Sequence, residues 1–202
     1  MIKTVIFDIG NVMVDFCFDE FIKKNGDPKE IRERIRRATL ESGFWGELDK
    51  GILSYEEVLQ KFIEKDPGLE AQIRAIFCDT SGIVLKRDYA IPLVKRLRCN
   101  GYQVLALSNF PEKVYQENRE PLAFLQEMNG YILSYQDHVI KPDARIYRLL
   151  QERYDFIPAE CVFIDDLQEN LDAAKAQGWN TILFTGYEQM LMKLAKLGVK
   201  TD

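Results

Sequence analysis

The sequence predicts an α/β protein: a doubly wound parallel sheet with a small all-helical cap inserted after the first strand. From about residue 83 onward, short apolar stretches alternate with helical stretches, the pattern of strands joined by crossover helices. Between the first apolar stretch and this alternation, residues 18–82 show helical spacing only. We therefore expect a core formed by residues 1–17 and 83–202, and a cap formed by residues 18–82.

The first strand is expected in TVIFDIGNVMV, whose nearly continuous apolar character is typical of a buried parallel strand and the loop after it. The cap helices are indicated by DPKEIRERIRRATL and SYEEVLQKFIEK, where Ile and Leu recur at helical spacing. Pro28 and Pro67 lie near expected helix starts, and Ser54 with Glu57 predicts a capping box.

The rest of the core is expected to alternate between helices and strands. A helix over 89–98 precedes the strand YQVLALS, and a helix starting near Pro111 precedes the strand YILS. A helix beginning at Pro142 leads to the strand CVFID. The helix QENLDAAKAQ, the strand NTILF and a last helix from Tyr187 follow.

Composition excludes several classes of protein. With 202 residues, of which 47% are hydrophobic, the chain can bury a full core. A net charge of −5 and a pI near 5.1 argue against a nucleic-acid partner. No apolar run approaches the roughly 20 residues of a membrane span, and the first one ends at Asp8, too early for a signal peptide. The four cysteines form no CxxC pair, so we expect reduced thiols and a cytoplasmic protein.

Four short segments combine apolar residues with polar groups suited to chemistry. In chain order they supply a carboxylate, a hydroxyl, a lysine and a pair of carboxylates; the segments are FDIGN (7–11), LSN (107–109), KPD (141–143) and FIDD (163–166). Ligands of parallel α/β sheets bind outside the carboxyl ends of the strands, so we expect these segments to meet in one pocket. Three carboxylates, one ammonium group and one hydroxyl suit a magnesium ion with a phosphate better than an apolar ligand.

Each candidate also has a purely structural explanation. Asp8 alone fits a helix cap or a loop contact, and Lys141 alone fits a surface lysine. The pair Asp165 and Asp166 fits a Walker B strand, but no GxxxxGK[ST] segment accompanies it. Adjacent like charges otherwise require a cation beside them.

The segment at Ser108 and Asn109 is the weakest signal, because Ser-Asn often forms a turn. A serine triad is excluded, since no GxSxG motif is present and the chain has one histidine. We interpret that residue, His138, as a loop residue.

The order of these segments resembles the haloacid dehalogenase superfamily of phosphohydrolases over nearly the whole chain. The closest resemblance is to the bacterial subgroup of α-D-glucose-1-phosphate phosphatase, which opens with FDxGNV and carries SQD-x-x-x-x-KP-x-x-x-IY. Here the second stretch reads SYQDHVIKPDARIY, with one extra residue before QD. The resemblance implies a phosphatase that acts on a small phosphorylated metabolite, with a helical cap that closes over the site.

The resemblance also assigns roles to residues. Asp8 would be the nucleophile that forms an aspartyl-phosphate, and Lys141 would screen charge between it and the phosphoryl group. Ser108 would be catalytic and Asn109 would bind substrate by holding phosphate oxygens. A Mg²⁺ cofactor would be held by Asp8, the carbonyl of Gly10, Asp165 and Asp166, while Asn11, Asp15 and Asn170 would support the surrounding loops.

In the cap, the stretch GFWGELDKG (43–51) would form a substrate-facing lip, with Trp45 and Glu47 in contact with the substrate. The alternative is that Trp45 and Phe44 belong to the core of the cap. Residue composition does not separate these two interpretations.

Gly10 departs from the family pattern, because most phosphatases of this superfamily carry a second Asp there. Without that general acid, we expect weak activity on alkyl phosphates and better activity on anomeric sugar phosphates, whose leaving groups are more acidic. Asp15 is a candidate replacement base, or else only a brace for the loop.

Two rival functions remain. A 2-haloacid dehalogenase would use the same nucleophile without metal, but that branch generally lacks an Asp-Asp pair. The other rival is a weakly catalytic phosphoacceptor or phosphate-binding protein. Response-regulator receiver domains are phosphoacceptors of this kind, but their acidic pair comes first in the chain, whereas here it comes last.

Overall fold

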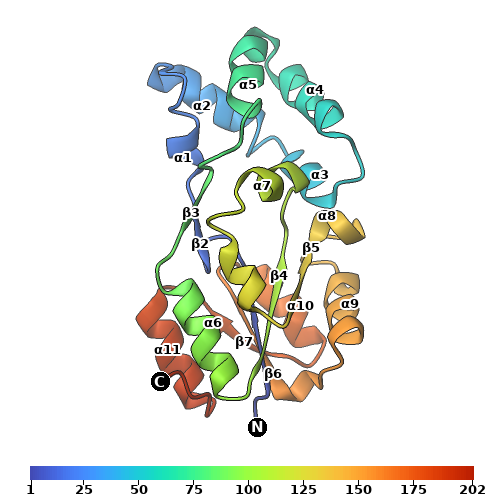
Figure 1. Ribbon diagram of the computed structural model, residues 1–202. Helices are drawn as coiled ribbons and strands as arrows, with labels where there is room; N and C mark the ends of the chain where they lie inside the picture. Colours follow the sequence, from blue (N-terminus) through green and yellow to red (C-terminus); the bar gives the residue numbers. More distant parts are fainter.

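The computed structural model describes all 202 residues, and its centre is a five-stranded parallel sheet with the order β5-β4-β1-β6-β7 (Figure 1). The strands are β1 (Thr4–Phe7), β4 (Gln103–Ser108), β5 (Gly130–Leu133), β6 (Cys161–Asp165) and β7 (Asn180–Leu183). From β1 the chain builds outward to β4 and β5, then returns to the other side of β1 for β6 and β7. The carboxyl end of β1 therefore lies at a topological switch point, where such sheets bind ligands.

Helices cover both faces of the sheet, as predicted. Val5 and Phe7 belong to the larger hydrophobic cluster, with residues of α6 (Ala90–Cys99) and α11 (Tyr187–Lys196). Ile6 points to the opposite face, where it packs in a second cluster with residues of α9 (Ala144–Tyr154) and α10 (Gln168–Ala176). Burial on both faces explains why β1 reads as a continuous apolar run.

A block of helices lies beyond the carboxyl ends of the central strands (Figure 1). It is formed by α1 (Phe18–Phe21), α2 (Lys29–Ala38), α3 (Trp45–Lys50), α4 (Tyr55–Lys65), the 3₁₀ turn η1 (Pro67–Leu69) and α5 (Glu70–Phe77). The capping box at the start of α4 is confirmed, because the Ser54 side chain and the Glu57 backbone and side chain bond reciprocally. None of the helices has the length and apolar character required to cross a bilayer.

A short antiparallel pair, β2 (Val14–Phe16) with β3 (Val84–Lys86), joins the helical block to the core. The pair is held by Arg87, whose guanidinium lies 2.7 Å from a carboxylate oxygen of Asp15. The chain therefore leaves the sheet and returns to it through two adjacent strands. This pair was not predicted, since strands of three residues are too short to show an alternating pattern.

The remaining elements are α7 (Glu112–Glu117), η2 (Ala123–Glu127), α8 (Ser134–Asp137) and η3 (Pro158–Glu160). The helix expected to begin at Pro142 was placed too early. It begins at Ala144, because the carboxylate of Asp143 accepts a hydrogen bond from the Arg145 N–H at 2.9 Å and caps the helix.

Gly130 at the start of β5 is expected to tolerate no side chain. A Cβ atom there would lie 2.1 Å from Tyr154 Cε1, and the Tyr154 hydroxyl is fixed by hydrogen bonds to the N–H and C=O of Tyr131. We expect Gly130→Ala to lower the free energy of unfolding by about 2–3 kcal/mol, measured by urea denaturation.

Gly46→Ala is the matched control for Gly130→Ala. Its Cβ would meet only Ile140 Cδ1, at an ordinary 3.5 Å. We expect this variant to be within about 1 kcal/mol of the wild type, because alanine also favours the helix. Equal stability of the two variants would contradict the packing described at Gly130.

Candidate active site

Three neighbouring strands place the predicted polar groups side by side. β1 pairs with β4 and β6 so that Phe7 lies opposite both Ala106 and Ile164. The residues that end these strands or follow them, Asp8, Ser108 and Asp165, therefore meet at one edge of the sheet, and all three are buried. Parallel register thus brings together side chains that are far apart in the sequence.

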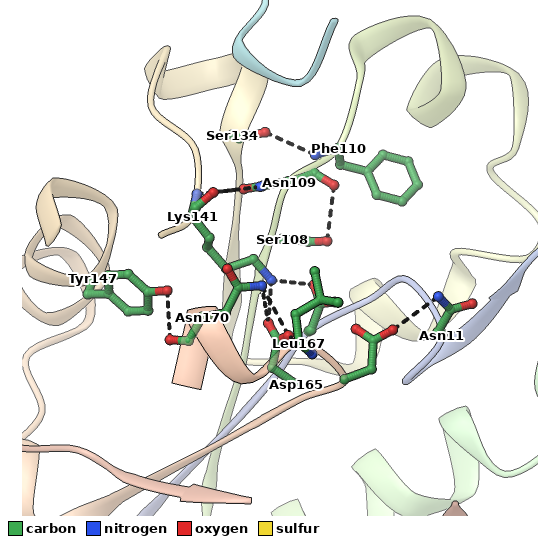
Figure 2. A network of polar contacts seen from close by, with 12 residues as sticks. Asn11, Ser108, Asn109, Phe110, Ser134, Lys141, Tyr147, Asp165, Leu167 and Asn170 are labelled. Atoms are coloured by element: carbon green, nitrogen blue, oxygen red, sulfur yellow. Dashed lines mark hydrogen bonds and ion pairs between the residues drawn. The ribbon is translucent and has the colours of Figure 1, made fainter. Parts of the chain in front are cut away.

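Lys141 lies between two of these carboxylates, in the loop before α9 (Figure 2). Its Nζ donates to Asp8 Oδ1 and to Asp165 Oδ2, at 2.7 Å in both cases. Burial opposes the charge on Lys141, but the carboxylates of Asp165 and Asp8 outweigh it and raise the pKa of the ammonium group. The lysine is therefore a permanent cation inside the site.

Asp165 is held by groups that leave little freedom to its carboxylate. Asn170 Nδ2 donates to its two oxygens at 3.0 and 3.1 Å, and the Leu167 N–H donates to Oδ1 at 2.8 Å. The side chain of Asn170 thus fixes the orientation of the Asp165 carboxylate.

Asp8 is the residue predicted from the sequence to be the nucleophile, and the charge of its carboxylate is costly to bury. Burial raises the pKa of its carboxyl to about 7, and the nearby Asp165 adds to this, while Lys141 and Ser108 oppose it. The surroundings of Asp8 thus disfavour its anion, so a further positive charge would stabilise the site.

The acidic residues fit a divalent cation. One oxygen from each of Asp8, Asp165 and Asp166 lies within 4.8 Å of the others. Three carboxylates against the single ammonium of Lys141 leave an excess of two negative charges, and burial raises the pKa of Asp166. Asn11 Nδ2 donates to Asp166 at 3.1 Å and orients it. Hard oxygen ligands of this kind suit Mg²⁺.

A cavity of about 260 Å³ opens above these groups. This volume lies just below the roughly 300–1,000 Å³ typical of ligand pockets, which favours a small ligand. The lining combines polar residues with aromatic and aliphatic ones; the principal ones are Asp8, Gly10, Phe16, Trp45, Asp49, Val84, Ser108, Phe110, Lys141 and Asp166.

Three predicted residues have partners that the sequence did not indicate. Asn109 lines the cavity, and its side chain accepts from the Lys141 N–H at 2.7 Å and donates to the Lys141 carbonyl at 3.0 Å, so any phosphate contact would come from its backbone. Glu47 does not line the cavity and pairs with Lys50 at 2.9 Å. Asp15 also lies outside the cavity lining, in its ion pair with Arg87, an arrangement that favours a brace for the loop over a replacement base.

Trp45 packs in the interior of the helical block and also faces the cavity, so the two positions left open by the sequence are not exclusive. It makes aromatic contacts with Phe16, Phe18, Phe62 and Phe77, and it also lines the cavity. Phe44, by contrast, lies outside the cavity lining, with the ammonium groups of Lys61 and Lys65 5.0 Å from its ring.

Asp49 was missed by the sequence analysis. It is buried in α3, lines the cavity, and its carboxylate forms no hydrogen bond or ion pair. A signal was present, since Trp45 and Asp49 are four residues apart and share one face of a helix, whereas Glu47 is two residues from Trp45 and does not.

The fold and the site together define an α/β protein that brings a strand-end carboxylate, a buried lysine and an acidic cluster into one pocket beneath a helical block. Residues 2–178 match the family model of haloacid dehalogenase-like hydrolases, so the chain belongs to that family. This confirms the family resemblance and the fold class.

Two individual relatives have low sequence identity to this chain. The chain is 24% identical over 195 residues to a sesquiterpene phosphatase from Aspergillus oryzae, covering 96% of each chain. It is 29% identical over 196 residues to a D-ribitol-5-phosphate phosphatase from Bacteroides thetaiotaomicron, covering 90% of this chain and 91% of the relative.

Solved structures share the fold. A haloacid dehalogenase family enzyme from Bacteroides thetaiotaomicron, in complex with magnesium and inorganic phosphate, matches with a TM-score of 0.66 and 23% identity over 90% of this chain and 93% of the other. Solved dehalogenases share the fold as well, so the residues of the site must separate the two activities.

Proposed function

We propose that this protein is a magnesium-dependent phosphatase that hydrolyses a small phosphorylated metabolite through an aspartyl-phosphate on Asp8, with sugar or polyol phosphates as the favoured class. The observation that carries the proposal is the meeting of Asp8, Lys141 and the acidic pair at the floor of one small cavity. The relatives that act on phosphorylated substrates support it.

The residues divide the reaction between them. The Asp8 carboxylate attacks phosphorus, the bond from phosphorus to the leaving oxygen breaks, and water then hydrolyses the aspartyl-phosphate. Lys141 contacts Asp8 directly, so it can offset the charge that gathers between nucleophile and phosphoryl group. A magnesium ion bound by Asp8, Asp165, Asp166 and the Gly10 carbonyl would neutralise the phosphoryl oxygens.

The substrate class rests on the walls of the cavity. The ring of Trp45 offers an apolar surface, and Asp49 offers a carboxylate to hydroxyl groups. That combination suits a sugar or polyol better than a purely apolar chain. The glucose-1-phosphate subgroup and the cytoplasmic location stay predictions.

The rival dehalogenase would need no metal, and the acidic pair argues against it. Asp166 makes no ion pair and lies beside two further carboxylates, an arrangement that a metal-free reaction does not require.

Removal of divalent ions is expected to abolish hydrolysis. With EDTA, we expect turnover of 4-nitrophenyl phosphate to fall by roughly 10³-fold or more, because the excess negative charge would repel the phosphate. Added Mg²⁺ should restore turnover and raise the melting temperature, since it binds only the folded site.

Two variants test where the ion binds. Asp166→Asn should raise the magnesium concentration needed for both effects, whereas Asp172→Asn, an exposed residue on α10, should not. Full activity in EDTA, with chloride release from 2-chloropropionate, would instead establish the dehalogenase.

A further inference from the structure

The position next to the nucleophile lacks a side chain that its surroundings would accept. Gly10 lines the cavity, and a Cβ atom there would meet nothing within 4 Å. Its backbone does not have a positive φ, so no conformational constraint demands glycine. Position 10 therefore supplies no proton donor to the cavity.

Asp49 of α3 lines the same cavity and presents a carboxyl group without a partner. The residue is 8% exposed, and its side chain forms neither a hydrogen bond nor an ion pair. A buried carboxylate without a partner is costly unless it is protonated or meets a ligand. Burial raises the pKa of Asp49 to about 7, Asp8 adds to this, and Lys141 opposes it. A carboxyl with such a pKa is present in both protonation states near neutral pH.

The backbone around Asp49 is fastened to the core. The hydroxyl of Ser134, which begins α8, donates to the Asp49 carbonyl at 2.5 Å and accepts from the Phe110 N–H at 2.9 Å. The ring of His138 donates from Nδ1 to the Lys50 carbonyl at 2.9 Å. These contacts fix the end of α3 against the loop that follows β4, so Asp49 has a defined position over the site.

We propose that Asp49 is the general acid and base of this phosphatase and takes the role that a carboxyl group at Gly10 would otherwise fill. When Asp8 attacks phosphorus and the bond to the leaving oxygen breaks, the electron pair passes to that oxygen, which takes the Asp49 proton to give the alcohol. Asp49 then accepts a proton from the water that attacks the aspartyl-phosphate, which releases phosphate and regenerates Asp8. This inference rests on the proposed phosphatase function.

A cap-borne acid changes the expected substrate range. From Gly10 alone we expected weak activity on alkyl phosphates, whose leaving alkoxides are strongly basic. With Asp49 as proton donor, alkyl phosphates become good substrates, since general acid catalysis typically contributes about 10²–10⁴-fold.

The test compares two leaving groups in one pair of variants. We expect Asp49→Asn to lower kcat for glycerol 1-phosphate by roughly 10²-fold or more, and for 4-nitrophenyl phosphate by less than about tenfold, because nitrophenolate leaves without a proton. Glu56→Gln, an exposed cap residue paired with Arg74, should leave both values unchanged. Adding Gly10→Asp to Asp49→Asn should restore much of the loss on glycerol 1-phosphate.

Other outcomes overturn the inference. An equal loss on both substrates, or a raised KM with unchanged kcat, would make Asp49 a binding contact only. Unchanged turnover of glycerol 1-phosphate would remove it from the reaction. In either case, wild-type hydrolysis of 4-nitrophenyl phosphate with Mg²⁺ would still support the phosphatase, whereas an inactive wild type would refute both proposals.

Discussion

Asp8→Asn is expected to reduce phosphatase turnover on the order of 10⁴-fold or more while the protein stays folded. The amide has almost the same shape as the carboxylate, but it is a poor nucleophile and a weaker magnesium ligand. Its neutral charge also removes a burial cost, since burial raises the pKa of Asp8 to about 7. Steady-state hydrolysis of 4-nitrophenyl phosphate gives the loss, and urea denaturation monitors the fold.

A chemical trap ties this loss to the covalent step. Wild-type enzyme quenched in acid during turnover of a labelled substrate should carry label that hydroxylamine releases, and Asp8→Asn should carry none. Asp172→Asn serves as the control for an aspartate outside the cavity. Near-normal hydrolysis by Asp8→Asn would remove Asp8 from the mechanism.

Lys141→Met is expected to damage both stability and activity. The substitution keeps a long side chain but leaves the carboxylates of Asp8 and Asp165 buried without the ammonium group that they share at 2.7 Å. Breaking a buried pair from one side typically costs about 3–5 kcal/mol. Loss of charge stabilisation at the phosphoryl group should lower kcat by roughly 10²–10³-fold.

The loss of stability in Lys141→Met should depend on pH. Without the ammonium group, the folded-state pKa of Asp8 would rise further above its unfolded value of 3.8. A carboxyl with a raised folded pKa binds its proton more tightly in the folded state, so stability falls as pH rises through the window between the two pKa values. Urea denaturation should therefore show a larger deficit near pH 8 than near pH 5.

Two further measurements complete the test of Lys141. Added Mg²⁺ should recover part of the lost stability, because it supplies positive charge at the same carboxylates. Lys175→Met on α10, whose side chain is 55% exposed, should change little under any of these conditions. If the loss of unfolding free energy in Lys141→Met depends on neither pH nor magnesium, it comes from a packing defect instead.

The sheet and most helices could be predicted from the sequence because their burial is regular. β1 is apolar on both faces, and the helices of the core carry one apolar side, so each has a recognisable period. The β2–β3 pair could not be predicted, because its partners are about 70 residues apart and each strand is short. The start of α9 was misplaced because a capping side chain outweighed the usual preference of Pro142.

The site was predictable where strand ends determine position, and less so where loops and the cap determine it. Asp8, Ser108 and Asp165 follow from parallel register alone. The role of Asn109 depends on the path of the loop that carries Lys141, which the sequence does not specify. Asp49 could be assigned to the site only once the structure showed which side of α3 faces the cavity.

The central place of β1 has a consequence for how the protein is made. Thr4 lies beside Gln103 on one side and Cys161 on the other, so β1 leaves the ribosome before both of its neighbours and waits for them. At about 5–20 residues per second, that delay is roughly 8–30 seconds. Helices α4 and α5, which follow each other in the chain and pack together, can form during this time. Asp8 is thus synthesised well before the strands that flank it, and the pocket around it can close only after β6 has been made.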